Sequence, residues 1–132
     1  MQIVILYAAT LIVFAVLDAV MLSNIMKPLF EKYLGDLIRS PINFGPAAVF
    51  YLFYIAGILF LVSLPALRDG NVLSAVIGGA VLGAVAYGTY EFTSMSIMRD
   101  WSWQMVAVDT TWGAVLTATS AGAGVWAVKA FS

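Results

Sequence analysis

The chain has 132 residues, of which 63% are hydrophobic and only 10% charged, and its mean hydropathy is +1.00. Soluble domains usually carry about a quarter charged residues, so the composition predicts a membrane protein, and the net charge of −1 gives no support for nucleic-acid binding. The sequence contains no Cys and no His, which excludes disulfides, the usual zinc and iron–sulfur sites, and Ser/His or Cys/His catalysis; no metal or cofactor is expected.

The first apolar segment starts almost at the N-terminus. It has no basic region before it and no secreted domain after it, so we interpret it as a retained membrane helix rather than a signal peptide. Four segments are long enough to cross a hydrocarbon core of about 30 Å. They cover residues 3–26, 47–67, 72–98 and 103–131. The short links at 68–71 and 99–102 favour antiparallel neighbours, so the predicted fold is all-α: a single domain over residues 1–132, forming a four-helix up-and-down bundle with both termini on one side.

Between the first two spans, residues 28–40 are typical of a short amphipathic helix. Pro28 suits a first helical turn, and polar residues such as Glu31 and Lys32 lie opposite an apolar face. We expect this helix to lie in the membrane interface. It is either a surface anchor or a lid over the acidic residues described next.

Three carboxylic acids lie inside the spans. Asp18, Glu91 and Asp109 are each eight or nine residues from the polar boundary of their span, which places each of them about 12–14 Å inside the membrane. No Lys, Arg or His lies at that height. An ionisable side chain in a bilayer is costly, and it is a functional hypothesis by default. Carboxylates that are close together repel each other, so one or more of the three is expected to stay protonated.

Hydroxyl and indole groups reach the same height. The second and third spans supply tyrosines, each of which is either an interfacial anchor or a hydrogen-bond partner of a carboxyl group. Ser94 shares a helical face with Glu91, and Trp112 lies one turn from Asp109. The predicted ligand-binding residues are Asp18, Tyr51, Tyr54, Tyr87, Tyr90, Glu91, Ser94, Asp109 and Trp112.

Four short motifs occur in order, one in each span. They are Leu17-Asp18, Phe50-Tyr51-Leu52-Phe53-Tyr54-x-x-Gly57, Ala86-Tyr87-Gly88-Thr89-Tyr90-Glu91-Phe92-Thr93 and Asp109-x-x-Trp112-Gly113. The set, which covers nearly the whole chain, resembles the small bacterial membrane proteins of domain-of-unknown-function family 2177. That family usually reads Tyr-Asp-Leu-Thr-Asn in the third span, where this chain has Glu91 for the Asp and Ser94 for the Asn. It also usually continues the first motif to Trp-Leu-Gly, where this chain has Met21-Leu22-Ser23. The resemblance implies a bacterial membrane protein, a role for the acid at position 91, and a link to membrane-lipid modification or envelope stress.

Three functions remain open. The first is a protein that binds or conducts a proton, a cation or a small lipid-like amphiphile at the carboxylate and tyrosine cluster. The second is a membrane-lipid-modifying enzyme that uses paired carboxyls as general acid and base, although no catalytic residue is assigned. The third is an accessory subunit whose acids pair with basic residues of a larger membrane complex. The small bundle interior also makes a homo-oligomer plausible.

The orientation follows from the basic residues. Lys27, Lys32, Arg39 and Arg99 lie on the side nearer the acids, against Arg68 and Lys129 on the other side. The positive-inside rule therefore predicts a multi-pass protein of the bacterial inner membrane with periplasmic termini.

Overall fold

The computed structural model describes residues 2–34 and 44–131, which are almost entirely helical and contain no β-strand. The helical segments are α1 (Gln2–Met21), the wide π-helical turn η1 (Leu22–Met26), α2 (Lys27–Leu34), α3 (Phe44–Ile58), a second π-helical turn η3 (Leu59–Ser63), α4 (Leu64–Asp69), α5 (Val72–Ile97) and α6 (Trp103–Phe131). They form four runs, residues 2–33, 45–69, 72–97 and 103–131, that are long and apolar enough to cross a membrane. The predicted all-α fold with four helical runs long enough to be spans is confirmed.

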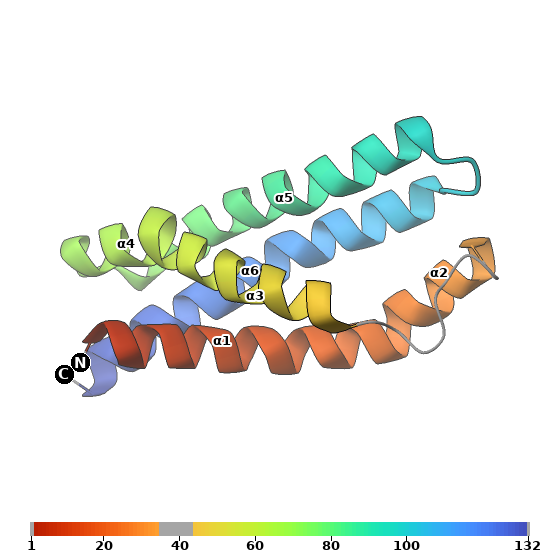
Figure 1. Cartoon of the computed structure of the whole chain (residues 1–132). Helices are drawn as coiled ribbons and strands as arrows, with labels where there is room; N and C mark the ends of the chain where they lie inside the picture. Colours follow the sequence, from red (N-terminus) through yellow and green to blue (C-terminus); the bar gives the residue numbers. More distant parts are fainter. Residues whose placement is uncertain (1, 35–43, 132) are drawn as a thin grey trace.

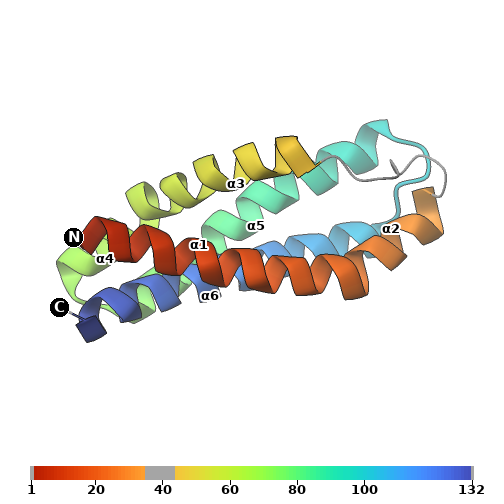
Figure 2. The ribbon, with the colours of Figure 1, turned by 60° about the horizontal axis from the view of Figure 1, so that its bottom comes forward.

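The four runs pack side by side as an up-and-down bundle. The two chain termini and the turn after α4 lie at one end of the molecule, which we call the terminal end (Figures 1 and 2). Helix α2 and the link between α5 and α6 lie at the other end, which we call the α2 end. Since α1 and α5 run toward the α2 end and α3 and α6 run back, consecutive spans are antiparallel.

The first helical run continues through Pro28, where the sequence predicted a separate helix to begin. Proline lacks an N–H, and its ring crowds the carbonyl four residues earlier, which is that of Asn24. Asn24 is the central residue of η1, and the wider π-helical turn provides room for this carbonyl. The same arrangement recurs at Pro65, because Leu61 is the central residue of η3. Residues 35–40 of the predicted interfacial helix lie outside the described residues, and the position of α2 relative to the membrane stays a prediction.

Helix α6 is the centre of the bundle, with α5 on one side and α1 on another. A Cβ atom added at Gly79 would lie 2.8 Å from the carbonyl oxygen of Thr117, and one added at Gly83 would overlap the carbonyl of Gly113. On the α1 side, a Cβ atom at Gly124 would overlap the hydroxyl of Thr10. These small residues allow two backbones to approach closely, as expected for helices that pack within a membrane.

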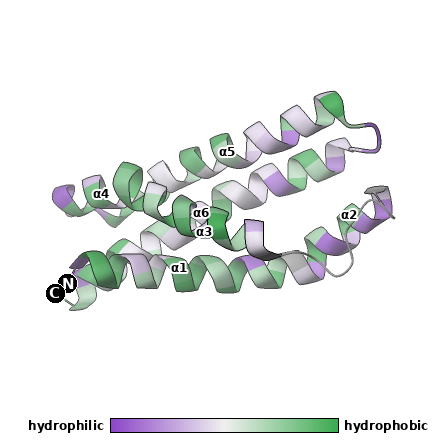
Figure 3. Cartoon of the chain, viewed as in Figure 1, coloured by the Kyte–Doolittle hydropathy of each residue, from purple (hydrophilic) through white to green (hydrophobic). Residues whose placement is uncertain are grey.

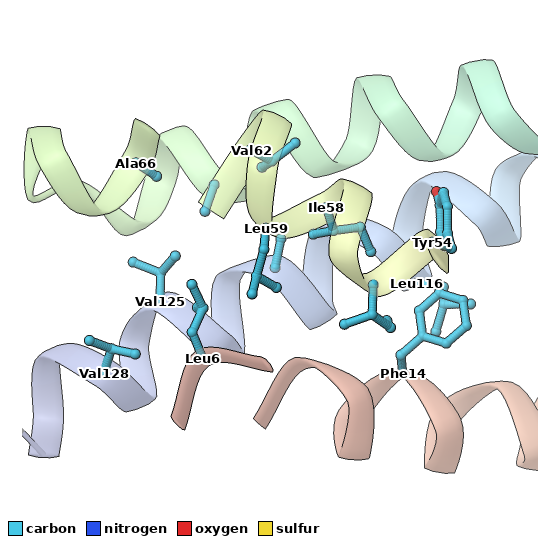
Figure 4. Packing of buried hydrophobic residues seen from close by; sticks show 13 residues of the cluster. Leu6, Phe14, Tyr54, Ile58, Leu59, Val62, Ala66, Leu116, Val125 and Val128 are labelled. Atoms are coloured by element: carbon cyan, nitrogen blue, oxygen red, sulfur yellow. The ribbon is translucent and has the colours of Figure 1, made fainter. Parts of the chain in front are cut away.

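Two apolar clusters fill the interior. The larger cluster extends to the terminal end, where Leu6, Val125 and Val128 pack together (Figure 4). The smaller one lies at the α2 end and contains the buried residues Leu29, Trp101, Met105 and Val106. Asp109 follows the smaller cluster along α6 and precedes Leu116 of the larger one. The acidic residues therefore lie where the two clusters meet.

The outer surface of the spans is apolar. Ile12, Val16, Phe60, Val81 and Val85 are all more than half exposed, although they lie in the middle of their helices. Figure 3 shows the hydrophobic residues spread along the four runs and polar residues at both ends. Such a surface suits contact with lipid, which agrees with a multi-pass membrane protein.

Candidate functional site

Glu91 is the most deeply buried of the three acids. It lies on α5, its side chain has no exposed surface, and its Oε1 accepts a hydrogen bond of 2.9 Å from the indole Nε1 of Trp101. Trp101 belongs to the link after α5, which folds back and places the indole against the helix. The second oxygen of Glu91, Oε2, is buried and receives no hydrogen bond from an N–H or O–H group of the described residues.

Asp109, on α6, faces Glu91. It is 9% exposed, and its carboxyl group lies close enough to that of Glu91 for the two side chains to interact directly. The pairing follows from the antiparallel hairpin, because Glu91 lies six residues before the last residue of α5 and Asp109 six residues after the first residue of α6. A hydrogen bond between two carboxyl groups requires a proton on one of them, since two ionised carboxylates are both acceptors. We call Glu91 and Asp109 the carboxyl pair.

Asp18, on α1, lies near the carboxyl pair but has other partners. Its Oδ2 accepts a hydrogen bond from the hydroxyl of Tyr51 on α3, and its Oδ1 accepts one of 3.1 Å from the indole Nε1 of Trp112 on α6. It is partly buried, and it is one of the acidic groups that act electrostatically on Asp109. The structure therefore brings the three acids into one region, with two of them in direct contact.

The remaining predicted tyrosines surround this region without bonding to the acids. The hydroxyl of Tyr54 lies 2.9 Å from Thr117 Oγ1, and the ring of Tyr87 fills the space left by Gly113. Tyr90 packs edge-on against Trp101, with 5.7 Å between the ring centroids. Of the four tyrosines, Tyr51 is the one that forms a hydrogen bond with a carboxylate.

Ser94 lies one turn beyond Glu91 and is partly buried. Within residues 2–34 and 44–131 its hydroxyl makes no hydrogen bond. The structure therefore supplies no contact between Ser94 and the three acids.

The charges around the carboxyl pair all have the same sign. The groups that act on Asp109 are Glu91 and Asp18, both acids, and the spans place no Lys or Arg at this height. The part of the chain that the structure describes contains no group of three acidic side chains close enough to hold one metal ion. What faces the acids instead are neutral donors, namely two indoles and a phenol.

A family model described as "Predicted membrane protein (DUF2177)" matches residues 3–126. The chain belongs to this family. No curated protein and no solved structure matches it. The family description specifies a membrane protein and no activity, so the resemblance found in the four motifs is confirmed, whereas the function depends on the geometry of the site.

In this member of the DUF2177 family, sequence reasoning missed the contribution of Trp101. A Trp at the end of a span is usually an interfacial anchor, so the sequence alone does not predict that Trp101 contacts Glu91. It is instead 8% exposed and donates a hydrogen bond to Glu91. Its neighbour Trp103, by contrast, is 64% exposed. The sequence contains no signal that separates these two tryptophans.

The arrangement is chemically suited to hold one proton between two carboxyl groups. If the pair held one proton and released it, the resulting charge would be next to the Trp101 indole and near the donors that bind Asp18. Indole and phenol donors stabilise a carboxylate through hydrogen bonds while remaining neutral themselves. A pair of carboxyls in which one is protonated can also act as general acid and base, which is the chemistry that an enzyme would use.

Proposed function

We propose that this protein binds a proton reversibly within the membrane at the Glu91–Asp109 carboxyl pair. The observation that carries the proposal is that these two acids lie side by side and buried, with no Lys or Arg at their height in the spans. A hydrogen bond between two carboxyl groups forms only when one of them holds a proton. Two carboxyls in contact inside a low-dielectric bundle cannot easily both be ionised, because each disfavours the charge of the other. The pair is therefore suited to exchange one proton with its surroundings.

A proton is better supported than a metal cation as the bound species. Both oxygens of Asp18 and one oxygen of Glu91 already accept hydrogen bonds from Tyr51, Trp112 and Trp101. A hard cation needs several carboxylate or carbonyl oxygens directed at one point. The acids of the described residues do not provide such a group of three.

Reversible binding is better supported than free conduction across the membrane. Toward the terminal end, the side chains of Leu6, Val125 and Val128 are at most 1% exposed and close the interior (Figure 4). The α2 end, where the link after α5 and the short helix α2 cover the pair, is therefore the side from which we expect the pair to exchange its proton. Transport across the membrane would require a rearrangement of the bundle or a partner.

The proposal includes a location in the bacterial inner membrane with periplasmic termini. The basic residues Lys27, Lys32 and Arg99 lie at the α2 end, against Arg68 and Lys129 at the terminal end. The positive-inside rule then assigns the α2 end to the cytoplasm. In this orientation the carboxyl pair exchanges protons with the cytoplasm.

The test uses dicyclohexylcarbodiimide, a hydrophobic reagent that reaches protonated carboxyl groups from the lipid. Purified protein in liposomes is treated with it, and the modified residue is identified by mass spectrometry. We expect modification at Glu91 or Asp109, more slowly at alkaline pH, where the shared proton is lost. The double variant Glu91→Gln/Asp109→Asn should abolish it. The control variant Asp69→Asn, at an exposed site near the terminal end, should behave as the wild type. Absence of modification at both positions in the wild type at every pH would refute the proposal.

A further inference from the structure

Helix α2 covers the side of the carboxyl pair that faces the α2 end of the bundle. The rings of Phe30 and Trp101 pack edge-to-face, with 5.4 Å between centroids, and Leu29 joins the same buried cluster. The indole of Trp101 in turn donates to Glu91. Trp101 is therefore a single layer between α2 and the buried acid.

Besides the packing of Leu29, two aromatic side chains of α2 make contacts that hold the helix in this position. One is the aromatic contact of Phe30 with Trp101. The other is a hydrogen bond of 2.9 Å from the hydroxyl of Tyr33 to Oε1 of Gln104, in the first turn of α6. The second contact is solvent-exposed, and exposed hydrogen bonds are among the first to open. The outer part of α2 is therefore held by contacts that can be broken without unfolding a span.

The connection between α1 and α2 is suited to bending. Pro28 cannot donate a backbone hydrogen bond, and the π-helical turn η1 directly precedes α2. Helix kinks occur mainly at prolines and at π-helical turns, and here the two coincide. The α2 segment is therefore joined to α1 at the position where the first run departs from a regular α-helix.

We propose that α2 is a hinged cover that bends at η1 and controls access from the aqueous phase to the Glu91–Asp109 pair, with Trp101 as the layer that it holds in place. This inference rests on the proposed proton-binding function and adds its regulation. When α2 is seated, Leu29 and Phe30 shield Trp101 from water. When α2 swings out, Trp101 loses its cover, and water reaches the oxygens of Glu91.

The chain contains no cysteine, so cysteines can be introduced at chosen positions without background reactions. The double variant Tyr33→Cys/Gln104→Cys replaces the two residues of the exposed hydrogen bond. A bifunctional maleimide about as long as the two original side chains would then fix α2 to α6. The same variant treated with a monofunctional maleimide serves as the matched control.

Two carbodiimides distinguish a failure of the α2 cover from a failure of the proton-binding site. A water-soluble carbodiimide measures access to the pair from the aqueous phase, and dicyclohexylcarbodiimide measures access from the lipid. We expect cross-linking of α2 to slow modification by the water-soluble reagent and to leave modification by the hydrophobic reagent unchanged. Tyr33→Phe should accelerate the aqueous reaction about three- to tenfold, which corresponds to the loss of one ordinary hydrogen bond.

Tyr7→Phe is the control for the loss of a tyrosine hydroxyl, because Tyr7 donates to the carbonyl of Leu52, far from α2. It should leave the aqueous rate unchanged. If the water-soluble reagent modifies the cross-linked protein as fast as the protein treated with the monofunctional maleimide, α2 is not a cover. The proposed proton binding is unaffected by that result as long as the hydrophobic reagent still modifies the Glu91–Asp109 pair. If neither reagent modifies the pair in any variant, the proposed proton binding at Glu91 and Asp109 is refuted. The proposed role of α2, which depends on it, is then refuted as well.

Discussion

Tyr51 and Trp112 meet at Asp18, each donating a hydrogen bond to a different oxygen of its carboxylate. Because Tyr51 comes from α3, Trp112 from α6 and Asp18 from α1, one acidic side chain ties three spans together. Within a membrane the hydrophobic effect does little to hold helices against each other, so contacts of this kind contribute to the arrangement of the bundle.

Replacing Asp18 with Asn should destabilise the bundle. The amide keeps one acceptor oxygen but turns an N–H group toward the second donor, so either Tyr51 or Trp112 loses its partner. We expect the free energy of unfolding in mixed micelles to fall by about 1–3 kcal/mol. The control Asp69→Asn, at the exposed end of α4, should leave it unchanged. Equal stabilities of the two variants would contradict the structural role of Asp18.

Trp101→Phe removes the indole N–H and retains most of the apolar ring. Both oxygens of Glu91 would then lack an N–H donor, and we expect a loss of about 1–3 kcal/mol in the free energy of unfolding. Trp103→Phe is the matched control, because Trp103 is two residues away and largely exposed. It should change stability by no more than about 0.5 kcal/mol. The comparison fails if both substitutions cost the same.

Infrared spectroscopy tests directly whether the Glu91–Asp109 pair holds the proposed proton. A protonated carboxyl group absorbs at a frequency distinct from that of a carboxylate, and the band shifts in D₂O. We expect such a band in the wild type and in Asp18→Asn, and we expect its loss in Glu91→Gln/Asp109→Asn. A band that survives in the double variant would place the proton elsewhere.

Gly83→Ala tests the close contact of α5 with α6. Its new Cβ atom would overlap the carbonyl of Gly113, so the two helices would have to separate. We expect a loss of about 1–3 kcal/mol or more. A Cβ atom at Gly57 on α3 would meet no atom within 4 Å, so Gly57→Ala should be neutral or stabilise the protein by up to about 1 kcal/mol. Unfolding in mixed micelles measures both, and a neutral Gly83→Ala would show that the α5–α6 interface is looser than described.

The spans could be predicted from the sequence because lipid demands long uninterrupted apolar helices. Counting residues from the span ends also gave the relative height of Glu91 and Asp109, since a helix rises by a constant amount per residue. The helix that continues through Pro28 was not foreseen. The sequence shows a proline that is acceptable at a helix start, and it does not show that a π-helical turn will accommodate that proline inside a longer helix.

The direction in which each side chain points could not be predicted in the same way. In a soluble protein the polar face of a helix identifies the outside, but here both lipid and core are apolar, so Phe14 and Phe53 look alike in the sequence. In the structure Phe14 is fully buried, whereas Phe53 is 74% exposed. For the same reason the partner of Tyr54 proved to be Thr117, while Tyr51 bonds to Asp18. Such pairings depend on helix rotation, which a pattern of uniformly apolar residues does not encode.

The π-helical turn η1 has a consequence for the register of the first helical run. A π-helical turn contains about one residue more than an α-helical turn, and an α-helix advances by about 100° per residue. If η1 tightened into regular α-helix, α2 would rotate by about that angle, and Phe30 would leave the ring of Trp101. A slip of one residue in the backbone would thus be converted into a quarter turn of α2, with Asp18 and the rest of α1 remaining in place.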